Sequence, residues 1–505
     1  MKSLSIILIG GLALFGLKGF GQPYGYYQDA LRFSQTNPFG STARIQALGG
    51  SQIALGGDIS SAGSNPAGLG FFNRSVFSFT PTVTFHNSDG NYGGEIIPSY
   101  QPNFNLPNFG IVLNHTIGDI PEDKFKGGSF AISFTRINDF NQVSNYGGYS
   151  PQSSIVDAFL SNSGTIAPGN LSEMEYAAYY TYLTDPFYDG GGNLTEYQTY
   201  VGVEPYQTEK IITSGGQNQL NFSWGGNYND KVYFGAGLGV QTLNFKRSRY
   251  YYEDDFIYYV DGTAYDDDRI NSLYLSDEYT INGAGINGTF GLILRPISVL
   301  TMGISYTTPT YLALRDESSF IMDVDWNNFA YDDSTILDQE SYVSDITVSD
   351  YNLRTPSKLS VGAAFFLGKL GFITGDVEYV DYSSAQFQSN TPELNMNADN
   401  QEIINLYRNT LNYRLGAEVR MDIFRFRAGY AYTADPYRDA EFDRSRQNLT
   451  LGVGIRKKNF YTDLAVVNTL YKDIYSPYYL PDNSQPQVQF DNQNTAISAT
   501  VGFTF

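Results

Sequence analysis

The 505-residue sequence contains no cysteine, only two histidines, and 31 Lys and Arg against 52 Asp and Glu. Without cysteine the chain can form no disulfide framework, thiolate zinc site, iron-sulfur cluster or cysteine nucleophile. A net charge of -21 repels phosphate backbones and argues against a nucleic-acid partner. Charged residues are scarce at 16%, whereas aromatic residues, mostly 42 Tyr and 35 Phe, are abundant. That balance is typical of a surface at a membrane interface.

Long apolar runs are missing except at the N-terminus. There Lys2 precedes the apolar stretch 4–17, and a Gly-Phe-Gly sequence supplies the small residues of a cleavage site. The stretch is shorter than the roughly 18 to 20 residues of a membrane-spanning helix, which argues against an uncleaved anchor. We therefore expect residues 1–21 to be a secretory signal peptide and Gln22 to begin the mature chain.

Elsewhere, short stretches alternate apolar residues with small or polar ones at the two-residue period of a β-strand. The segment 495–505 places Ile497, Val501 and Phe505 on one face and small or polar residues on the other. An ending on an aromatic residue resembles the terminal strand signature of bacterial outer-membrane barrels. The aromatic faces and the charged opposite faces favour a strand between lipid and lumen over a strand of a soluble sandwich.

About 14 such strands can be placed, an even number as a closed bacterial barrel requires. Connections after the odd strands are long and rich in acidic residues, and those after the even strands are mostly tight. Since backbone hydrogen bonds cannot stay open in hydrocarbon, the strands must close on themselves. The expected fold is all-β, a transmembrane antiparallel β-barrel of about 14 strands. The predicted strands are 75–85, 107–115, 128–137, 217–226, 231–247, 285–295, 299–307, 357–366, 371–381, 410–421, 423–433, 447–456, 459–468 and 495–505.

Residues 22–74 precede the first strand and are rich in Gly, Ser and Ala, with a short helix predicted at 26–33. They contain Ala-Leu-Gly-Gly at 47–50, Ala-Leu-Gly-Gly-Asp at 54–58 and Ser-Asn-Pro-Ala-Gly-Leu at 64–69. Followed directly by a strand, these motifs resemble the N-terminal hatch of the FadL/TodX family of outer-membrane transporters for long-chain fatty acids and hydrocarbons.

The resemblance continues through 288–309 and 355–384. It implies a hatch, or plug, at 22–74 in the lumen and an outer-membrane β-barrel with long extracellular loops at 75–505. It also implies passive uptake of a small hydrophobic molecule, which is caught at the outer face and released sideways into the membrane beside a distorted strand. The location implied is the outer membrane of a Gram-negative bacterium, with outer-membrane lipid and the barrel assembly machinery as partners.

A gate is predicted in the third of these motifs. Pro66 cannot donate a backbone hydrogen bond and restricts Asn65 to extended geometry, while the Asn65 side chain can bond neighbouring backbone. A compact turn of this kind could sit in the lumen and still move. The alternative is that it only ends the plug. The predicted gate residues are Asn65, Pro66, Ala67, Gly68 and Leu69.

A row of charges is predicted to face the lumen from two neighbouring strands. Arginines there could orient a ligand carboxylate by bidentate hydrogen bonds. The alternative is a charge ladder that holds the barrel wall and the plug together. The row comprises Arg414, Glu418, Arg420, Arg425 and Arg427.

No enzyme, cofactor or metal site is expected. His86 and His115 fall at opposite ends of neighbouring strands, roughly 30 Å apart, so they cannot share a haem or a metal. Only His86 is placed for a membrane hydrolase. The segment 323–327 alternates oxygen ligands but lacks the glycine and glutamate of an EF-hand.

A second class of function remains open: a barrel that does not transport but docks outer-membrane protein partners, such as those of type IX secretion, through its acidic loops.

Overall fold

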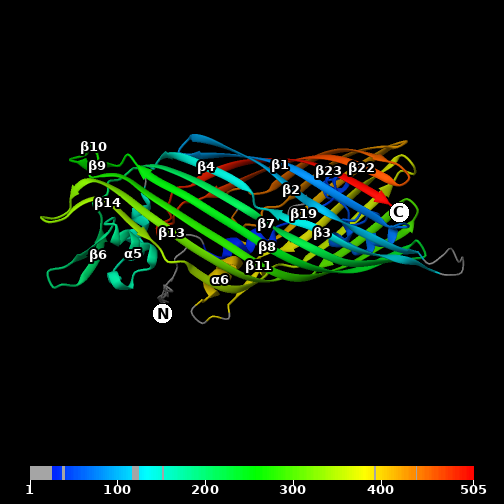
Figure 1. Cartoon of the computed structure of the whole chain (residues 1–505), viewed down its shortest axis with the longest axis horizontal. Coiled ribbons are helices and arrows are strands. Elements are labelled where there is room, and N and C mark those ends of the chain that lie inside the picture. Colours follow the sequence, from blue (N-terminus) through cyan, green and yellow to red (C-terminus); the bar gives the residue numbers. More distant parts are fainter. Residues whose placement is uncertain are drawn as a thin grey trace, which may run out of the picture.

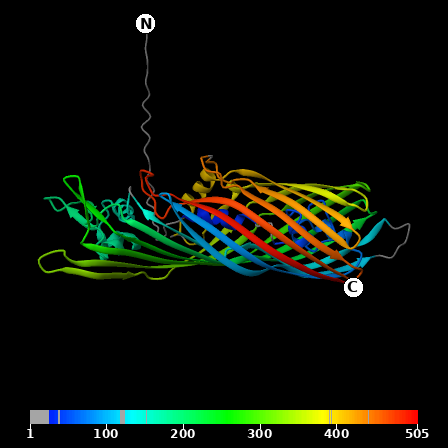
Figure 2. The same ribbon diagram turned by 90° about the horizontal axis from the view of Figure 1, so that it is seen from above.

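A computed structural model describes residues 25–36, 40–116, 124–150, 153–389, 391, 394–439 and 441–505. The predicted signal peptide and its cleavage site lie outside these residues. The described residues form a closed antiparallel barrel of 14 strands (Figure 1). The last strand pairs with the first, with Phe503 opposite Phe77, and Figure 2 shows the two side by side. The predicted fold class is therefore confirmed.

Some wall strands consist of two or three segments in line, because the ladder is briefly interrupted. In order around the barrel the fourteen are β1 (Val76–Tyr92), β2 (Glu95–Thr116), β3 (Phe125–Asp139) with β4 (Gln142–Tyr149), β7 (Tyr206–Tyr228), β8 (Val232–Asp254), β11 (Ile270–Ile297), β12 (Leu300–Thr307) with β13 (Tyr311–Ala330), β14 (Ile336–Val343) with β15 (Thr347–Arg354) and β16 (Lys358–Phe366), β17 (Gly371–Asp381) with β18 (Gln386–Gln388), β19 (Asn409–Met421), β20 (Phe424–Thr433), β21 (Arg446–Arg456), β22 (Phe460–Tyr475) and β23 (Val488–Thr504).

The remaining elements are short. Two hairpins lie outside the barrel sheet, β5 (Asp185–Tyr188) with β6 (Leu194–Gln198) and β9 (Ile257–Val260) with β10 (Thr263–Asp266). The helices are α1 (Tyr27–Ser34), α2 (Ala43–Gln46), α3 (Ser61–Ser64), η1 (Pro66–Phe71), α4 (Ile155–Ser163), η2 (Pro168–Asn170), α5 (Glu173–Tyr180), η3 (Tyr382–Ser384) and α6 (Asn397–Leu406). In the described ranges, no helix has both the length and the apolar character needed to cross a membrane.

Each predicted strand matches a wall strand, and β17, β19, β20 and β21 agree with the predicted bounds to within about one residue, but others, such as β2, β7 and β11, run much further than predicted at one end. The predicted strand 107–115 is only the inner part of β2, which begins at Glu95, and β1 and β2 are joined by Gly93 and Gly94 alone. The prediction of a long loop after the first strand is therefore wrong. Beyond the membrane the outward face turns polar, as at Arg315 and Glu317, so the alternation that marks a lipid-facing strand is lost.

The barrel wall has two chemically different faces over its inner half. Phe222 and Trp224 point outward and are 37% and 39% exposed, whereas Asn221 and Ser223, which alternate with them, point inward and are buried. The same alternation on the other strands builds a continuous apolar outer belt. A belt of this extent is far larger than the apolar patches of soluble monomers, so it places the barrel in an outer membrane. Its outward residues include Phe77, Leu113, Leu238, Ile304, Leu415, Phe426, Leu451, Val466 and Ile497.

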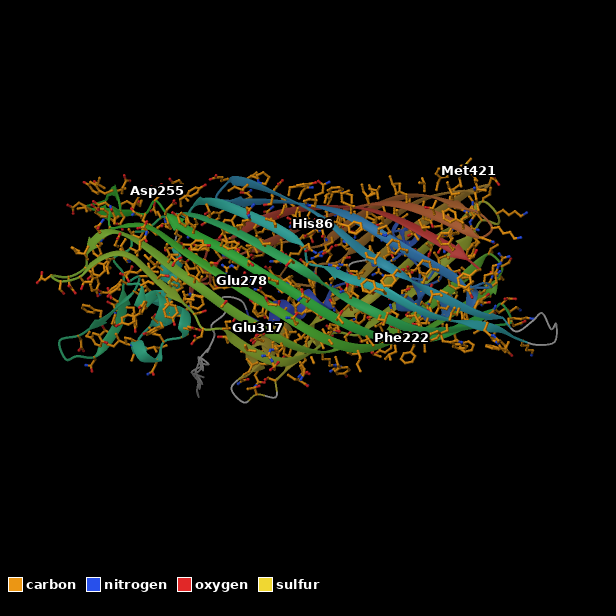
Figure 3. The ribbon with its side chains drawn as sticks, viewed as in Figure 1. His86, Phe222, Asp255, Glu278, Glu317 and Met421 are labelled. Carbon is orange, nitrogen blue, oxygen red and sulfur yellow. The ribbon has the colours of Figure 1, made fainter. Side chains whose placement is uncertain are left out.

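The outer ends of the strands around β8, β11 and β13 extend beyond the body of the barrel (Figure 1). Figure 3 shows Asp255, in the connection after β8, at the opposite end of the long axis from Met421. Helices α4 and α5 pack on the inner face of this extension, where Phe159 and Ala177 bury against Met322 and Trp326. The extension is thus a folded outer module with a core of its own.

Candidate functional site

Residues 40–72, called here the lumenal segment, lie inside the barrel (Figure 2). The Ala43 amide donates to Thr500 Oγ1 of β23 over 2.8 Å, and Ser223 of β7 donates to the Ala62 carbonyl over 2.6 Å. These partners are inward-facing and come from different parts of the wall. The lumenal segment therefore spans the space between them, where it satisfies its backbone groups with wall side chains.

The predicted gate residues form a capped turn in this segment. Asn65 Oδ1 accepts the Ala67 amide over 3.2 Å and so caps η1, while Nδ2 donates to the Ile53 carbonyl over 2.7 Å. Pro66 occupies the first position of η1, where its missing amide costs nothing. All five residues, Asn65, Pro66, Ala67, Gly68 and Leu69, are buried.

Glycines of the wall allow this turn to approach closely. A Cβ on Gly291 of β11 would collide with Asn65 Oδ1, and one on Gly225 of β7 would collide with the Pro66 carbonyl oxygen. Gly288, three residues away on β11 and on its outward face, has no atom closer than 3.6 Å to a Cβ placed there. The wall is thus shaped to the turn at particular residues.

A cavity of about 630 Å³ lies on the outer side of the lumenal segment. Helix α1 forms one side through Leu31 and Arg32, and inward residues of the wall strands form the rest. Its aromatic lining includes Phe140, Phe245, Tyr471, Tyr479 and Phe490. The volume falls in the range of ordinary small-molecule sites.

The cavity is also rich in arginine. Arg249 is fully buried and bound to Glu209 over 2.5 Å and to Asp277 over 3.3 Å, so its charge is matched within the wall. Arg446 differs: its guanidinium lies 4.6 Å from the ring centroid of Tyr471, and among the described residues its acidic neighbour Asp473 acts on it from beyond the 4.0 Å of an ion pair. The site therefore offers one cation whose charge is not matched by a close ion pair. The arginines along the lining are Arg32, Arg136, Arg247, Arg249, Arg444 and Arg446.

The cavity meets the wall where the ladder between β2 and β3 ends. The two strands pair from Thr116 with Gly127 up to Asn108 with Thr135, and Pro107, the next residue of β2, has no amide to donate. Above that point β4 pairs with β7 alone in the described part of the chain. We call this break, between 103–107 of β2 and 136–140, the wall gap.

The wall gap arises because the third wall strand turns inward. The β3–β7 register shifts between Arg136 and Asn138, and β4 then contacts the inner faces of other strands: Gln142 donates to Asn492 of β23 over 3.1 Å. On the β7 side, Gly215 has a φ of 106°, which is natural only for glycine, and its carbonyl accepts from Arg136 Nη2 over 2.8 Å. Residues on both sides of the wall gap, including Asn105 and Pro107, line the cavity.

Side chains bridge the wall gap. Asn103 and Asn105 each donate from Nδ2 to Asp139 Oδ2 over 2.6 Å, and Arg136 holds the other oxygen of Asp139 over 3.1 Å. The surrounding outward face is apolar, since Phe104 is 70% exposed. A polar contact thus replaces the backbone ladder at one place in the lipid-facing wall.

The architecture is similar to that of solved outer-membrane transport proteins. A Pseudomonas aeruginosa FadL homologue matches with a TM-score of 0.53 and 14% identity over 93% of this chain and 98% of that chain. The Pseudomonas putida toluene transporter TodX matches with a TM-score of 0.51 and 13% identity, over 92% and 98%. This chain has the FadL fold. No protein-family model matches the sequence, and no curated protein is similar to it in sequence.

Within the FadL fold, the predicted charge row is mostly engaged with the wall's own carboxylates. Arg427 is fully buried, with Nε 2.8 Å from Glu418 and Nη1 2.7 Å from Asp463. Glu418 also binds Arg420 over 2.8 Å and lies 4.0 Å from Arg44 of the lumenal segment. These side chains do not line the cavity.

The other two members of the row lie apart from this group. Arg414 binds Glu378 of β17 over 2.9 Å. Arg425 donates to backbone carbonyls of the turn at Asp422, at the barrel end opposite the outer module. The five residues lie on the neighbouring strands β19 and β20, and the structure divides them among three sets of partners.

The two histidines occupy different environments. His86 lies in the cavity wall, 8% exposed, with a polar contact to Asn494, the residue opposite it on β23 (Figure 3). His115 is exposed near the inner end of β2, opposite Gly128. His86 thus belongs to the cavity, a placement that its position within a strand did not by itself reveal.

Proposed function

We propose that the protein is a passive outer-membrane channel for small hydrophobic molecules, with amphiphiles that carry an acidic head, such as long-chain fatty acids, as the preferred ligands. The ligand binds in the cavity and leaves sideways through the wall gap. The observation that carries the proposal is the meeting of the two: the cavity reaches the lipid-facing wall at the one interruption described in the β2–β3 ladder.

The lining of the cavity supports the ligand class. Its aromatic side chains suit an apolar chain, and Arg446 can pair with a carboxylate by charge-assisted hydrogen bonds. His86 and its neighbour Asn494 add buried polar groups to the lining. A pure hydrocarbon such as toluene would leave these groups unpaired, at a cost in binding free energy. Of the two solved proteins with the same fold, TodX is named as a toluene transporter, so the uptake test includes toluene as well as a fatty acid.

The lumenal segment is proposed to act as the hatch. It blocks the barrel below the cavity, and the Asn65 turn is held by a few hydrogen bonds and by close contact with glycines. Displacement of this turn would disturb only the short 3-10 helix η1 and would leave the wall ladders intact, so the turn can rearrange without opening the barrel sheet.

Transport is tested by uptake of labelled oleate and of toluene into cells that lack their own carrier. The decisive variant carries Asn105→Cys and Asp139→Cys, which allows a disulfide across the wall gap in a protein with no other cysteine. We expect oleate uptake to stop under oxidising conditions and to return on reduction. Uptake unaffected by a verified disulfide would refute sideways release.

A matched control places a disulfide between the same two strands, next to the wall gap. Asn108→Cys with Thr135→Cys joins the last residues that already pair across the same two strands. This disulfide should leave uptake unchanged, because the two strands are already paired at this position and the wall gap stays free. No uptake of either ligand by the correctly folded wild-type barrel would contradict the channel itself.

A further inference from the structure

The outer module contains an unpaired strand edge. In the described part of the chain β14 pairs only with β13, from Ile321 opposite Val343 to Ala330 opposite Ile336. Figure 1 shows β13 and β14 extending beyond the body of the barrel. A strand with one free edge presents a row of backbone amides and carbonyls that another extended chain can pair with.

Some of the devices that protect such an edge are absent from β14, although it carries Asp338 and Glu340 and its Tyr342 packs against Tyr176 of α5. Its sequence, Ile-Leu-Asp-Gln-Glu-Ser-Tyr-Val, has no proline, glycine or lysine. Ile336 and Val343 at its two ends are 68% and 66% exposed. These residues lie outside the membrane, because the charged outward residues Arg315 and Glu317 of β13 lie between them and the apolar belt. Lipid therefore does not account for their exposure.

The charge around the edge is of one sign. The segment 316–350 contains ten acidic residues and no lysine or arginine. Asp338 and Glu340 lie on β14 itself. A second copy of the edge would place like charges opposite each other, which is destabilising, whereas lysine or arginine on an added strand would form favourable cross-strand pairs. The acidic residues are Asp316, Glu317, Asp323, Asp325, Asp332, Asp333, Asp338, Glu340, Asp345 and Asp350.

We propose that β14 is a docking edge for an extended, basic segment of another protein, which joins the sheet as an added strand. Backbone hydrogen bonds to the free edge supply the general affinity. Apolar side chains of the segment cover Ile336 and Val343, and its basic side chains lie near Asp338 and Glu340. Binding at this edge is independent of the cavity and of transport.

The probe is a fluorescent nine-residue peptide in which lysine alternates with valine or threonine, added to the full chain in detergent. The Asp338→Lys, Glu340→Lys double variant should weaken binding by about tenfold or more, because two attractive cross-strand charges become repulsive. The matched control, Glu196→Lys with Asp266→Lys, makes the same change in charge on the exposed hairpins of the outer module and should change affinity less than about twofold.

Equal losses in the two double variants would mean attraction to net charge alone and would overturn the proposal. A peptide with N-methyl groups at alternate positions keeps its charge but cannot pair along both strands, so we expect it not to bind. Equal binding of the methylated peptide would also overturn the proposal.

A cross-link locates the contact. Gln339→Cys should form a disulfide with a cysteine in the peptide, whereas Tyr259→Cys on the neighbouring hairpin should not. If Gln339→Cys instead joins two barrels to each other in the presence of peptide, the occupant is a second copy and the proposal of a basic partner is wrong. Circular dichroism verifies that each variant is folded.

Discussion

The inner half of the barrel and the outer module are built from the same strands, but the two faces of these strands have different surroundings in the two regions. In the inner half the outward faces are apolar and the inward faces are covered by the lumenal segment, so each wall residue has lipid on one side or a fixed neighbour on the other. In the outer module the same strands face water outward and pack on helices inward. The inner half is therefore closed to new partners except at the wall gap, whereas the outer module retains a free edge.

The largest effect should come from breaking the buried charges of the inner half. Arg427→Gln removes one buried ion pair each from Glu418, which keeps Arg420, and from Asp463, which keeps Arg456, so we expect it to destabilise the barrel by about 3 kcal/mol. Unfolding in urea, followed by circular dichroism, measures this. Arg425→Gln, at an exposed turn, is the control and should cost less than about 0.5 kcal/mol.

A second variant tests the fit between wall and gate. Gly291→Ala places a methyl group against Asn65, so the turn must move, at a cost of about 1 to 3 kcal/mol. We expect the variant to conduct ions in planar bilayers, where the wild type is closed. Gly288→Ala on the same strand meets only ordinary contacts and should remain closed. Equal conductance of the two variants would show that the close approach at Gly291 has no part in closure.

A third variant tests whether the cavity, which lies between the inner half and the outer module, distinguishes a fatty acid from a hydrocarbon. Arg446→Gln removes the cation that is without a close carboxylate and should reduce oleate uptake by about tenfold, as expected for one charge-assisted hydrogen bond. Toluene uptake should not change. An equal loss for both ligands would indicate that Arg446 supports the cavity wall and does not bind the ligand head.

The smallest expected effect concerns α1, at the boundary of the outer region. Burial, followed by the nearby Asp29, raises the pKa of Asp316 to about 6, and the single Tyr279 hydroxyl lies 3.0 Å from Asp29 Oδ2 and 3.4 Å from Asp316 Oδ2. The raised pKa means that the state with α1 docked favours the protonated form of Asp316. The stability of docked α1 is therefore greatest below the ordinary pKa near 3.8 and falls as pH rises through about 6.

Docking of α1 should accordingly weaken by about 1 kcal/mol between pH 5 and pH 7.5. Hydrogen exchange of the amides of α1, corrected for the intrinsic dependence of exchange on pH, measures this change. Asp316→Asn cannot ionise and should remove the difference. A difference that persists in Asp316→Asn would assign it to another group.

The sequence predicted the inner half well because lipid and lumen impose opposite chemistry on alternate residues. Phe77 with Ser78, and Phe222 with Ser223, carry that signal directly, and the helix predicted at 26–33 is observed as α1. The outer parts of β2, β11 and β13 were interpreted as loops because water on one side and a local core on the other leave no such pattern. Glu317 and Asp323 lie in a strand yet look like loop residues.

The site was predicted less completely. The Asn65 turn was placed in the lumen by its motif, but Arg446 lies just after a connection and its neighbours in the cavity come from distant segments, so no local spacing reveals it. The wall gap did leave a signal. Pro98, Pro102 and Pro107 lie in one strand, and prolines within a strand indicate an edge or an interruption of the ladder.

The position of the wall gap also favours molecules with longer apolar chains, without any contribution from a binding group. It opens beside Phe104 and Val83, at the level of the lipid chains, so a departing molecule enters hydrocarbon without passing through water. Each additional methylene gains about 0.8 kcal/mol relative to water, which is roughly a fourfold change in partition. Return from the membrane to the aqueous outer face therefore becomes less favourable with every carbon of the chain. Longer molecules would be retained by the membrane itself, and net uptake would favour chain length even if the cavity bound all lengths equally.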